Sequence, residues 1–192
     1  MVASHPVRYA FREYVAHDDA SSTKHEYLEG QIYAMAGGTP EHSAMIGALA
    51  ARLAEGLRGG PCRLHSSDLR VRVRATGLTT YPDLTVVCGA WERDTDDPNT
   101  ITNPALVVEV LSPSTERYDR TEKLTHYQRI PSLRACILLA HDRREMEVHA
   151  RPVGGEPWVR SSYGPGQRVE LAGLAALDVD GIYDEASEPI AG

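Results

Sequence analysis

The sequence predicts an α/β (α+β) fold in which a mixed central β-sheet is flanked by helices. Apolar runs at residues 104–111 and 135–140 predict the sheet, because such near-continuous runs are typical of strands buried on both faces. Apolar side chains recur every four positions along residues 41–58, which predicts a long helix on one face of the sheet. The chain has 192 residues, 42% of them hydrophobic, which is enough for one domain with a buried core.

Short elements are expected before the long helix. Residues 1–20 are expected to form an N-terminal arm that ends in a short helix. Residues 25–35 are expected to form two short strands around a turn at residues 29–30. Thr39 and Pro40 precede the long helix, where threonine is a favoured N-cap and proline a favoured first helical residue. We therefore expect the helix to begin directly after Thr39.

The middle of the chain is expected to form two further strands and a loop. Residues 62–74 alternate between apolar and polar side chains and so predict a strand, followed after a turn by a second strand over residues 81–88. The polar face of the first strand carries three arginines: Arg70, Arg72 and Arg74. Residues 91–103 are polar and acidic, which predicts an exposed loop.

The C-terminal half is expected to hold a helix, a hairpin and an acidic tail. Residues 118–130 show helical periodicity, and residues 145–150 are expected to form a hairpin with residues 158–162. The last 15 residues contain five acids and no base, which indicates a tail with a partly ordered start. The expected division is an arm with a short helix, a folded domain and an acidic tail: residues 1–20, 21–177 and 178–192.

Charge and composition exclude several classes of protein. A formal net charge of −7 argues against the coating of nucleic acid or anionic membranes by bulk positive charge. Aromatic residues make up 6% of the chain, so a base-stacking platform is not expected. The first 20 residues lack an apolar leader, and no run approaches the roughly 20 apolar residues of a membrane span. We therefore expect a cytoplasmic protein.

Three cysteines, Cys62, Cys88 and Cys136, lie far apart in the sequence and form no CxxC pair. This pattern disfavours both a structural zinc site and a disulfide framework. We therefore expect three buried free thiols in a reducing compartment.

Two carboxylates and one lysine are the strongest candidates for a chemical function. Glu109 lies inside an apolar strand, where a charge is costly unless it is paired or binds a cation. Asp83 follows Pro82 at the start of a strand, so neighbouring strands would direct both carboxylates into one pocket. Lys123, one of only two lysines, lies on the helix after the Glu109 strand, where its ammonium could stabilise a charged transition state.

Carboxylate oxygens suit hard cations, so we expect Asp83 and Glu109 to bind Mg²⁺ or Mn²⁺. Such a metal can activate a water molecule and stabilise charge that develops on a phosphate. Taken singly, Asp83 could be a turn residue, Glu109 an ion-paired strand residue and Lys123 a solvated helix residue. The occurrence of all three residues in this order favours a metal-binding active site over these structural roles.

Several motifs carry a resemblance that covers residues 10–152. They are YPDL at 81–84, VVEVLSPST at 107–115, the order Asp119…Lys123…Tyr127, MAGGTPEH at 35–42 and SDLRV at 67–71. Together they resemble the Uma-two-type putative restriction endonucleases, which belong to the PD-(D/E)xK nuclease superfamily. The VEVLSPST string is specific, whereas a Pro-Asp pair alone is a weak signal.

This resemblance implies a restriction-endonuclease-like core with Asp83 and Glu109 as the metal-binding acids. The superfamily lysine would stand at position 111, where this chain has Leu111, and its role falls by resemblance to Lys123 on the following helix. His42 faces the site in the family pattern, and a capping or packing role for this histidine remains the open alternative. A homodimer is expected by analogy with nucleases that cut duplex DNA.

Three functions remain to be distinguished. The first is a Mg²⁺-dependent endonuclease whose metal-activated water attacks a phosphate of nucleic acid, expected to be DNA, held by Arg70, Arg72 and Arg74. The second is a catalytically silent nuclease fold with a binding or regulatory role. The third, a metal-independent hydrolase built on histidines, is disfavoured because the chain contains neither HExxH nor GxSxG.

Overall fold

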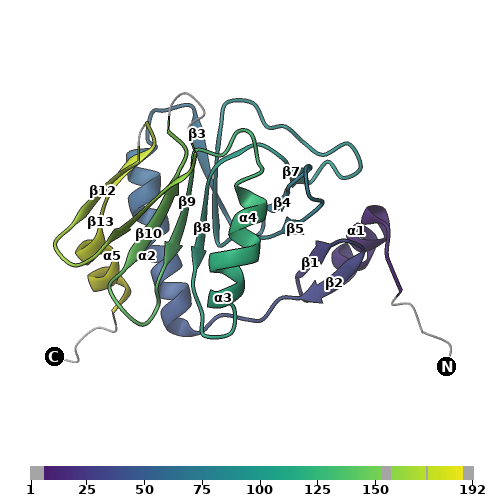
Figure 1. The fold of residues 1–192 in the computed structure, drawn as a ribbon, viewed down its shortest axis with the longest axis horizontal. Helices are drawn as coiled ribbons and strands as arrows, with labels where there is room; N and C mark the ends of the chain where they lie inside the picture. The colour runs from purple at the N-terminus through teal and green to yellow at the C-terminus, as the bar shows by residue number, and fades with distance from the viewer. Residues whose placement is uncertain (1–6, 153–156, 172, 188–192) are drawn as a thin grey trace.

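The computed structural model describes residues 7–152, 157–171 and 173–187, and it confirms the α+β architecture (Figure 1). Its centre is a six-stranded sheet in the order β11-β10-β9-β8-β6-β3. The strands of this sheet are β3 (Cys62–Ser66), β6 (Leu84–Cys88), β8 (Pro104–Val110), β9 (Ala135–Leu139), β10 (Met146–Ala150) and β11 (Val159–Tyr163). β8 and β9 pair in parallel while the other neighbours pair antiparallel, so the sheet is mixed.

Strands β8 and β9 form the buried centre of this sheet, as the two apolar runs predict. Every residue of both strands is buried. Burial on both faces is what a central pair of parallel strands requires, because helices cover each side. Glu109, in the middle of this apolar environment, is therefore held away from bulk water.

Helix α2 (Pro40–Gly56) covers one face of the sheet. Thr39 is its N-cap and accepts a hydrogen bond from the backbone N–H of His42, and Pro40 is the first helical residue, as predicted. Its buried apolar side chains, such as Leu49, join the main hydrophobic core. At 17 residues it is the longest described helix, and no helix in the described ranges is long and apolar enough to cross a membrane.

The other face is covered by a continuous helical run whose middle is a π-helix. The run consists of α3 (Glu116–Tyr118), η1 (Asp119–Lys123) and α4 (Leu124–Tyr127). It confirms a helix in the predicted region and provides the crossover that parallel strands need between β8 and β9. The wide turn was not predicted; π turns are rare and often accompany functional sites. Here the turn contains two buried charged residues, Asp119 and Lys123.

In the C-terminal region, residues 178–187 are folded, which extends the partly ordered start expected for the tail at residues 178–192. Its described elements are β12 (Arg168–Leu171), β13 (Ala175–Asp178) and α5 (Val179–Ala186). Strands β12 and β13 form an antiparallel hairpin, and α5 packs against α2 with its apolar side chains in the main core. A count of acids conceals this helix because its few apolar residues share one face. Residues 188–192 lie outside the described residues.

A second sheet, in the order β2-β1-β5-β4-β7, lies beside the first (Figure 1). Its strands are β1 (His25–Leu28), β2 (Gln31–Ala34), β4 (Arg70–Arg72), β5 (Thr79–Thr80) and β7 (Thr100–Ile101). Strands β1 and β2 form the predicted hairpin. Helix α1 (Phe11–Asp19), also predicted, joins the hairpin through a cluster of three aromatic side chains: Phe11, Tyr14 and Tyr27.

The strand predicted over residues 62–74 is divided between the two sheets, and the strand predicted over residues 81–88 begins later than expected. The strand expected over residues 62–74 is β3 followed by β4, with a turn at residues 67–69 between them. The strand expected over residues 81–88 begins only at Leu84, since Pro82 cannot donate a hydrogen bond to a sheet. Alternation of side chains identifies extended chain, but it does not reveal which sheet the chain joins.

The acidic segment at residues 91–103 is only in part the exposed loop that its composition predicts. Asp94 and Asp97 are buried, and they pair with Arg72 and Arg70 of β4. Part of the same segment forms β7, which pairs in parallel with β4. The burial is possible because buried carboxylates are tolerated when cations and hydrogen bonds compensate them.

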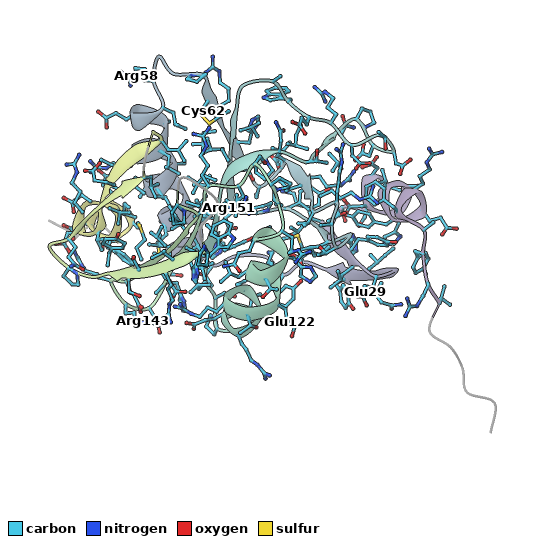
Figure 2. All side chains as sticks on the ribbon, turned by 45° about the horizontal axis from the view of Figure 1, so that its top comes forward. Glu29, Arg58, Cys62, Glu122, Arg143 and Arg151 are labelled. Atoms are coloured by element: carbon cyan, nitrogen blue, oxygen red, sulfur yellow. A yellow bond between two sulfur atoms is a disulfide. The ribbon has the colours of Figure 1, made fainter. Side chains whose placement is uncertain are left out.

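Cys62 and Cys88 form a disulfide, which contradicts the expectation of three free thiols. The two residues stand directly opposite each other in the antiparallel pairing of β3 with β6, with their Cα atoms 3.9 Å apart. Figure 2 labels Cys62 at this edge of the molecule. Strand register decides this pairing, and spacing in the sequence does not reveal it. Cys136 is buried and free, as expected.

Candidate active site

A cavity of about 390 Å³ lies where the two sheets and the helical run meet. Its walls come from the end of the β1–β2 hairpin, the loop into α2, and residues 109–115 at the end of β8. Acidic side chains from both sheets and from the π-helix face it. Four sequence-predicted residues line this cavity: His42, Asp83, Glu109 and Lys123.

The antiparallel pairing of β6 with β8 brings Asp83 and Glu109 together. Leu84 of β6 pairs with Val108 of β8, so Asp83, one residue earlier, lies opposite Glu109, one residue later. Asp83 Oδ2 accepts a hydrogen bond from the backbone N–H of Val110 at 2.7 Å, which fixes its carboxylate against the end of β8. The structure therefore places both carboxylates on one cavity, as the strand argument predicts.

Glu109 is a buried acid held by one cation and one hydroxyl. Its Oε1 lies 3.0 Å from Lys123 Nζ and accepts a hydrogen bond from the Tyr127 hydroxyl. Burial raises the pKa of Glu109 to about 8, and the neighbouring charges of Asp83 and Asp119 add to the rise, while Lys123 and Tyr127 oppose it. Burial therefore favours the protonated acid, whereas the adjacent Lys123 ammonium favours the carboxylate.

Lys123 lies inside a cage of carboxylates. Its Nζ is 2.9 Å from Glu26 Oε1, 3.0 Å from Glu109 Oε1 and 3.7 Å from Asp119 Oδ1. Burial alone would lower the pKa of the ammonium, but the three carboxylates outweigh burial and raise it well above its usual value. The ammonium is therefore directed at protein carboxylates, and its expected position beside a phosphate stays a prediction.

His42 connects α2 to the carboxylate end of β8. Its Nε2 lies 2.9 Å from the Val110 carbonyl oxygen and 3.5 Å from Asp83 Oδ2. The hydrogen bond to Asp83 raises the pKa of the imidazole, and burial works against that rise. Gly38 supplies the space for the ring, because a Cβ at that position would lie 2.7 Å from His42 Nδ1. The side chain lines the cavity while the backbone N–H is held by the Thr39 cap.

Three further residues of the site were given no role from the sequence, although Asp119 and Tyr127 belong to the motif that carries the family resemblance. Asp119 lies four residues before Lys123, a helical spacing that could have revealed it. Tyr127 follows at the next such position and bonds Glu109. Glu26 had no local signal, because it belongs to β1 in the other sheet; its Oε1 also accepts a hydrogen bond from the Thr80 hydroxyl.

The arginines expected to hold nucleic acid do not line the cavity. The Arg70 side chain is only 5% exposed and pairs with three acids of α1 and the 91–103 segment: Asp18, Asp19 and Asp97. Arg72 pairs with buried Asp94. Arg74 is half exposed and donates a hydrogen bond to the Arg93 carbonyl. Buried acids occupy the guanidinium groups of Arg70 and Arg72, which favours a structural role, and the contact of these arginines with nucleic acid stays a prediction.

The residues present fit a hard divalent cation, although the ligand set is small. No group of three or more His, Cys, Asp or Glu side chains suited to a metal occurs within the described residues. Two carboxylates, Asp83 and Glu109, and the Val110 carbonyl face the same cavity, and Mg²⁺ commonly uses one or two carboxylates with water and substrate oxygens. A cation on that carbonyl requires the His42 imidazole to release it.

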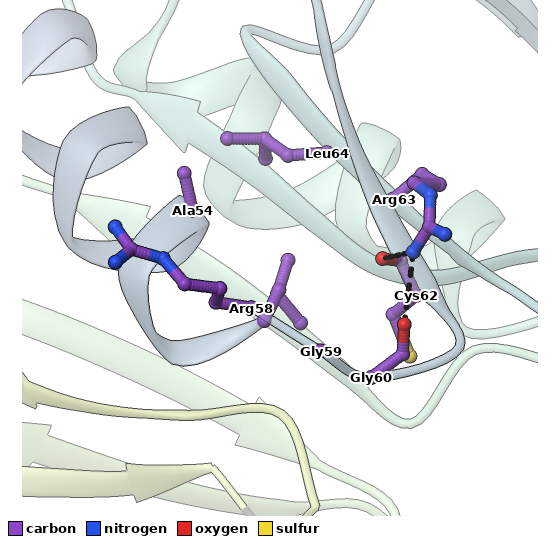
Figure 3. A pocket seen from close by; sticks show the side chains of 8 residues that line it. Ala54, Arg58, Gly59, Gly60, Cys62, Arg63 and Leu64 are labelled. Atoms are coloured by element: carbon purple, nitrogen blue, oxygen red, sulfur yellow. Dashed lines mark hydrogen bonds between the residues drawn. The ribbon is translucent and has the colours of Figure 1, made fainter.

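A second hollow of about 430 Å³ lies beyond the C-terminal end of α2, beside the disulfide (Figure 3). Arg63 Nη1 donates hydrogen bonds to the Gly60 and Cys62 carbonyls, both at 2.9 Å. No residue that lines this hollow is acidic. Its chemistry therefore does not suit a metal, and the cavity around Glu109 is the candidate active site.

Comparison with known proteins identifies the family of the chain. A family model described as "Uma2: Putative restriction endonuclease" matches residues 11–180. Two proteins of Synechocystis sp. (strain ATCC 27184 / PCC 6803 / Kazusa) are similar to the chain. "Uncharacterized protein slr1290" is 38% identical over 172 residues, covering 89% of both chains. "Uncharacterized protein sll1609" is 26% identical over 147 residues, covering 77% of this chain and 82% of the relative.

A solved structure shares the fold. It is a crystal structure from Anabaena variabilis ATCC 29413, described as a putative nuclease belonging to DUF820. The TM-score is 0.69 at 17% sequence identity, and the match covers 87% of this chain and 93% of the other. The likeness is one of architecture, and it agrees with the restriction-endonuclease-like core that the motifs imply.

Proposed function

Because the chain belongs to the Uma2 family of putative restriction endonucleases, we propose that it is a divalent-metal-dependent endonuclease that hydrolyses phosphodiester bonds of nucleic acid. The observation that carries the proposal is the position of Asp83 and Glu109, which lie on paired strands and line one cavity beside Lys123. Two carboxylates at such a place suit Mg²⁺ or Mn²⁺.

Asp83, Glu109 and the Val110 carbonyl are the groups that would hold Mg²⁺ or Mn²⁺. When bound, such a metal supplies a Lewis acid that lowers the pKa of a water molecule and offsets the charge of a phosphate. The protein holds the ligands in position. Lys123 and Tyr127 both bond Glu109 Oε1, so Oε2 is the oxygen that remains for a cation.

The protonation of Glu109 makes metal binding at this site depend on pH. Glu109 has a pKa of about 8 without a metal because of its burial, so it binds a proton at neutral pH. Metal ligands must be deprotonated, and metal binding therefore releases that proton. We expect the apparent metal affinity to increase as the pH rises toward 8.

Nucleic acid, expected to be DNA, is the proposed substrate. The chain carries a formal net charge of −7, and the cavity is lined by four acids: Glu26, Asp83, Glu109 and Asp119. A divalent cation would supply positive charge that lets a phosphate approach these acids. The homodimer expected by analogy with nucleases that cut duplex DNA stays a prediction.

The test is cleavage of supercoiled plasmid and of labelled single-stranded oligonucleotides with Mg²⁺, Mn²⁺ or chelator. Asp83→Asn and Glu109→Gln should each lower the cleavage rate by more than about 100-fold, since loss of an outer-shell partner alone costs up to about that much. Asp68→Asn is the matched control, because Asp68 is exposed and pairs only with Lys24. Cleavage that survives both site substitutions would reject this site.

A catalytically silent fold with a binding or regulatory role is the second candidate. The observation in its favour is the Lys123 ammonium, which already compensates the acids that would otherwise bind a cation. Calorimetric titration with Mn²⁺ separates the two candidates. Binding that is lost in Asp83→Asn supports the nuclease, and no binding at pH 8 supports the silent fold.

A further inference from the structure

The β1–β2 hairpin contributes two neighbouring side chains to the cavity. Glu26 of β1 and Tyr33 of β2 are direct partners in the antiparallel pairing, so their side chains lie on the same face of the hairpin. Both line the cavity. Glu26 is partly buried against Lys123, whereas Tyr33 is 53% exposed. The hairpin therefore contributes an exposed aromatic ring, Tyr33, and a partly buried acid, Glu26, to the lining of the cavity.

This exposed ring is unusual within the chain. Aromatic residues are scarce, at 6%, and most of those in the hairpin region are buried together. Tyr27, the other tyrosine of the hairpin, is 9% exposed and packs against Phe11 and Tyr14. The described residues include five exposed large hydrophobic side chains, and among these only Tyr33 lines the cavity. Core packing thus explains Tyr27 but leaves the position of Tyr33 unexplained.

We propose that Tyr33 binds an unpaired nucleobase by stacking, next to the phosphate that the carboxylates would engage. This inference rests on the proposed function and names its substrate class as single-stranded nucleic acid or an unpaired base in a duplex. Aromatic side chains bind bases of any sequence because every base has a π-face. Inside a duplex those faces are covered by neighbouring base pairs, so stacking requires a base outside the stack.

Other walls of the cavity are compatible with a base. Met35, Pro113 and Tyr118 also line it and offer apolar surface. The backbone between the hairpin and α2 contains two consecutive glycines, and a Cβ at Gly37 would meet nothing within 4 Å. A base that stacks on Tyr33 would therefore have apolar walls around it and open space beside the loop. Low aromatic content excludes an extended platform, but one ring is sufficient for one base.

Strand β2 is also the edge of its sheet, and exposed edges can pair with a second copy of the chain. Pairing of copies through β2 would bury Tyr33 and make it an interface residue. Sedimentation velocity of the unsubstituted chain and of Tyr33→Ala distinguishes an interface role from base stacking. If the unsubstituted chain forms a dimer and Tyr33→Ala is a monomer, the base-stacking inference is overturned.

The test measures binding without cleavage, in the unsubstituted chain with Ca²⁺ in place of Mg²⁺ or Mn²⁺. The probes are a fluorescein-labelled 12-nucleotide single strand, the same strand with an abasic site at each position in turn, and the matching duplex. Stacking on one base is worth about 1–3 kcal/mol, so Tyr33→Ala should weaken single-strand binding by about 5- to 150-fold. Tyr33→Phe keeps the ring and should stay within about 2-fold. Trp91→Ala is the control, because Trp91 is 48% exposed but does not line the cavity.

An abasic site at one position should reduce the affinity of the protein that retains Tyr33. The same abasic site should have no further effect on the affinity of Tyr33→Ala. Equal binding by Tyr33→Ala and its parent, equal losses for duplex and single strand, or no single-strand binding by the parent would each overturn the inference. Cleavage assays report separately on the proposed function. Metal-dependent cleavage with no Tyr33 effect rejects only this inference, and a Tyr33 effect without cleavage rejects only the nuclease activity.

Discussion

Lys123 and Glu26 join the two sheets through an ion pair in which Nζ and Oε1 are 2.9 Å apart. Glu26 belongs to the hairpin sheet, whereas Lys123 lies on the π-helix that covers the main sheet. The Lys123 side chain is buried at 5% exposure, and the Glu26 side chain is partly buried at 13% exposure. The N-terminal hairpin is therefore part of the site, since it holds the cation that in turn contacts Glu109.

Glu26→Gln tests this link. The amide removes one of the carboxylates around Lys123, so the ammonium loses part of its compensation while the shape of the side chain is kept. We expect the free energy of unfolding to fall by about 1–3 kcal/mol and nuclease activity to fall at least about 10-fold. Urea denaturation and plasmid cleavage measure the two effects. Glu29→Gln, in the same hairpin but outside the cavity lining, should change neither, and equal effects of both variants would contradict the link.

The two lysines of the chain should respond very differently to replacement by methionine. Lys123→Met leaves three buried or partly buried acids without their cation, which should cost about 3–5 kcal/mol of unfolding free energy. Lys24 is 40% exposed and pairs with exposed Asp68, so Lys24→Met should cost less than about 1 kcal/mol. Denaturant unfolding at pH 7 measures both. Similar costs for the two variants would show that the acids around Lys123 need no cation.

Glu109 should make the metal-free protein less stable as pH rises. Burial raises its pKa from 4.5 to about 8, so the folded protein binds a proton that the unfolded chain releases in this window. Unfolding free energy should therefore decrease between pH 4.5 and pH 8 by up to about 5 kcal/mol, at about 1.4 kcal/mol for each pKa unit. Urea denaturation in chelator at a series of pH values measures the slope. Glu109→Gln should remove this component, and an unchanged slope in that variant would assign the pH dependence elsewhere.

Adjacent glycines offer a matched test of the His42 position. A methyl group at Gly38 would meet His42 Nδ1 at 2.7 Å, while one at Gly37 would meet nothing within 4 Å. In the unsubstituted protein, Asp83 raises the pKa of His42. Gly38→Ala should displace the imidazole from Asp83, so the pKa of His42 should fall toward its usual value. NMR titration of the His42 ring measures it. Gly37→Ala should titrate like the unsubstituted protein, and an identical curve for Gly38→Ala would show that the ring does not depend on this space.

Arg70 should behave as a structural residue. Arg70→Gln leaves the buried carboxylates of Asp18 and Asp97 without a cation, which should lower the unfolding free energy by about 3–5 kcal/mol. Arg74→Gln, at a half-exposed position, should change it by no more than about 0.5 kcal/mol. Thermal and urea unfolding check both values. A stable Arg70→Gln that binds nucleic acid less tightly would restore the substrate role expected from the strand pattern.

Several parts of the fold could be predicted because they depend on local patterns. Burial on both faces of a strand produces a continuous apolar run, and this located β8 and β9. The Thr39-Pro40 pair marked the start of α2, since capping depends on adjacent residues. The apolar setting of Glu109 indicated an acid that needs compensation, and Lys123 lies close enough to provide it.

The remaining features depend on which strands pair and in which register. Cys62 meets Cys88, and Glu26 meets Lys123, only because segments far apart in the chain are placed side by side. For Arg70 the alternating pattern did not reveal its ion pairs, because the acids that bury it come from other elements. The sequence by itself determined the central strands, the long helix and two candidate metal ligands. Only the tertiary structure decided how each charge is compensated, because electrostatic compensation acts across space and leaves no periodic signal along the chain.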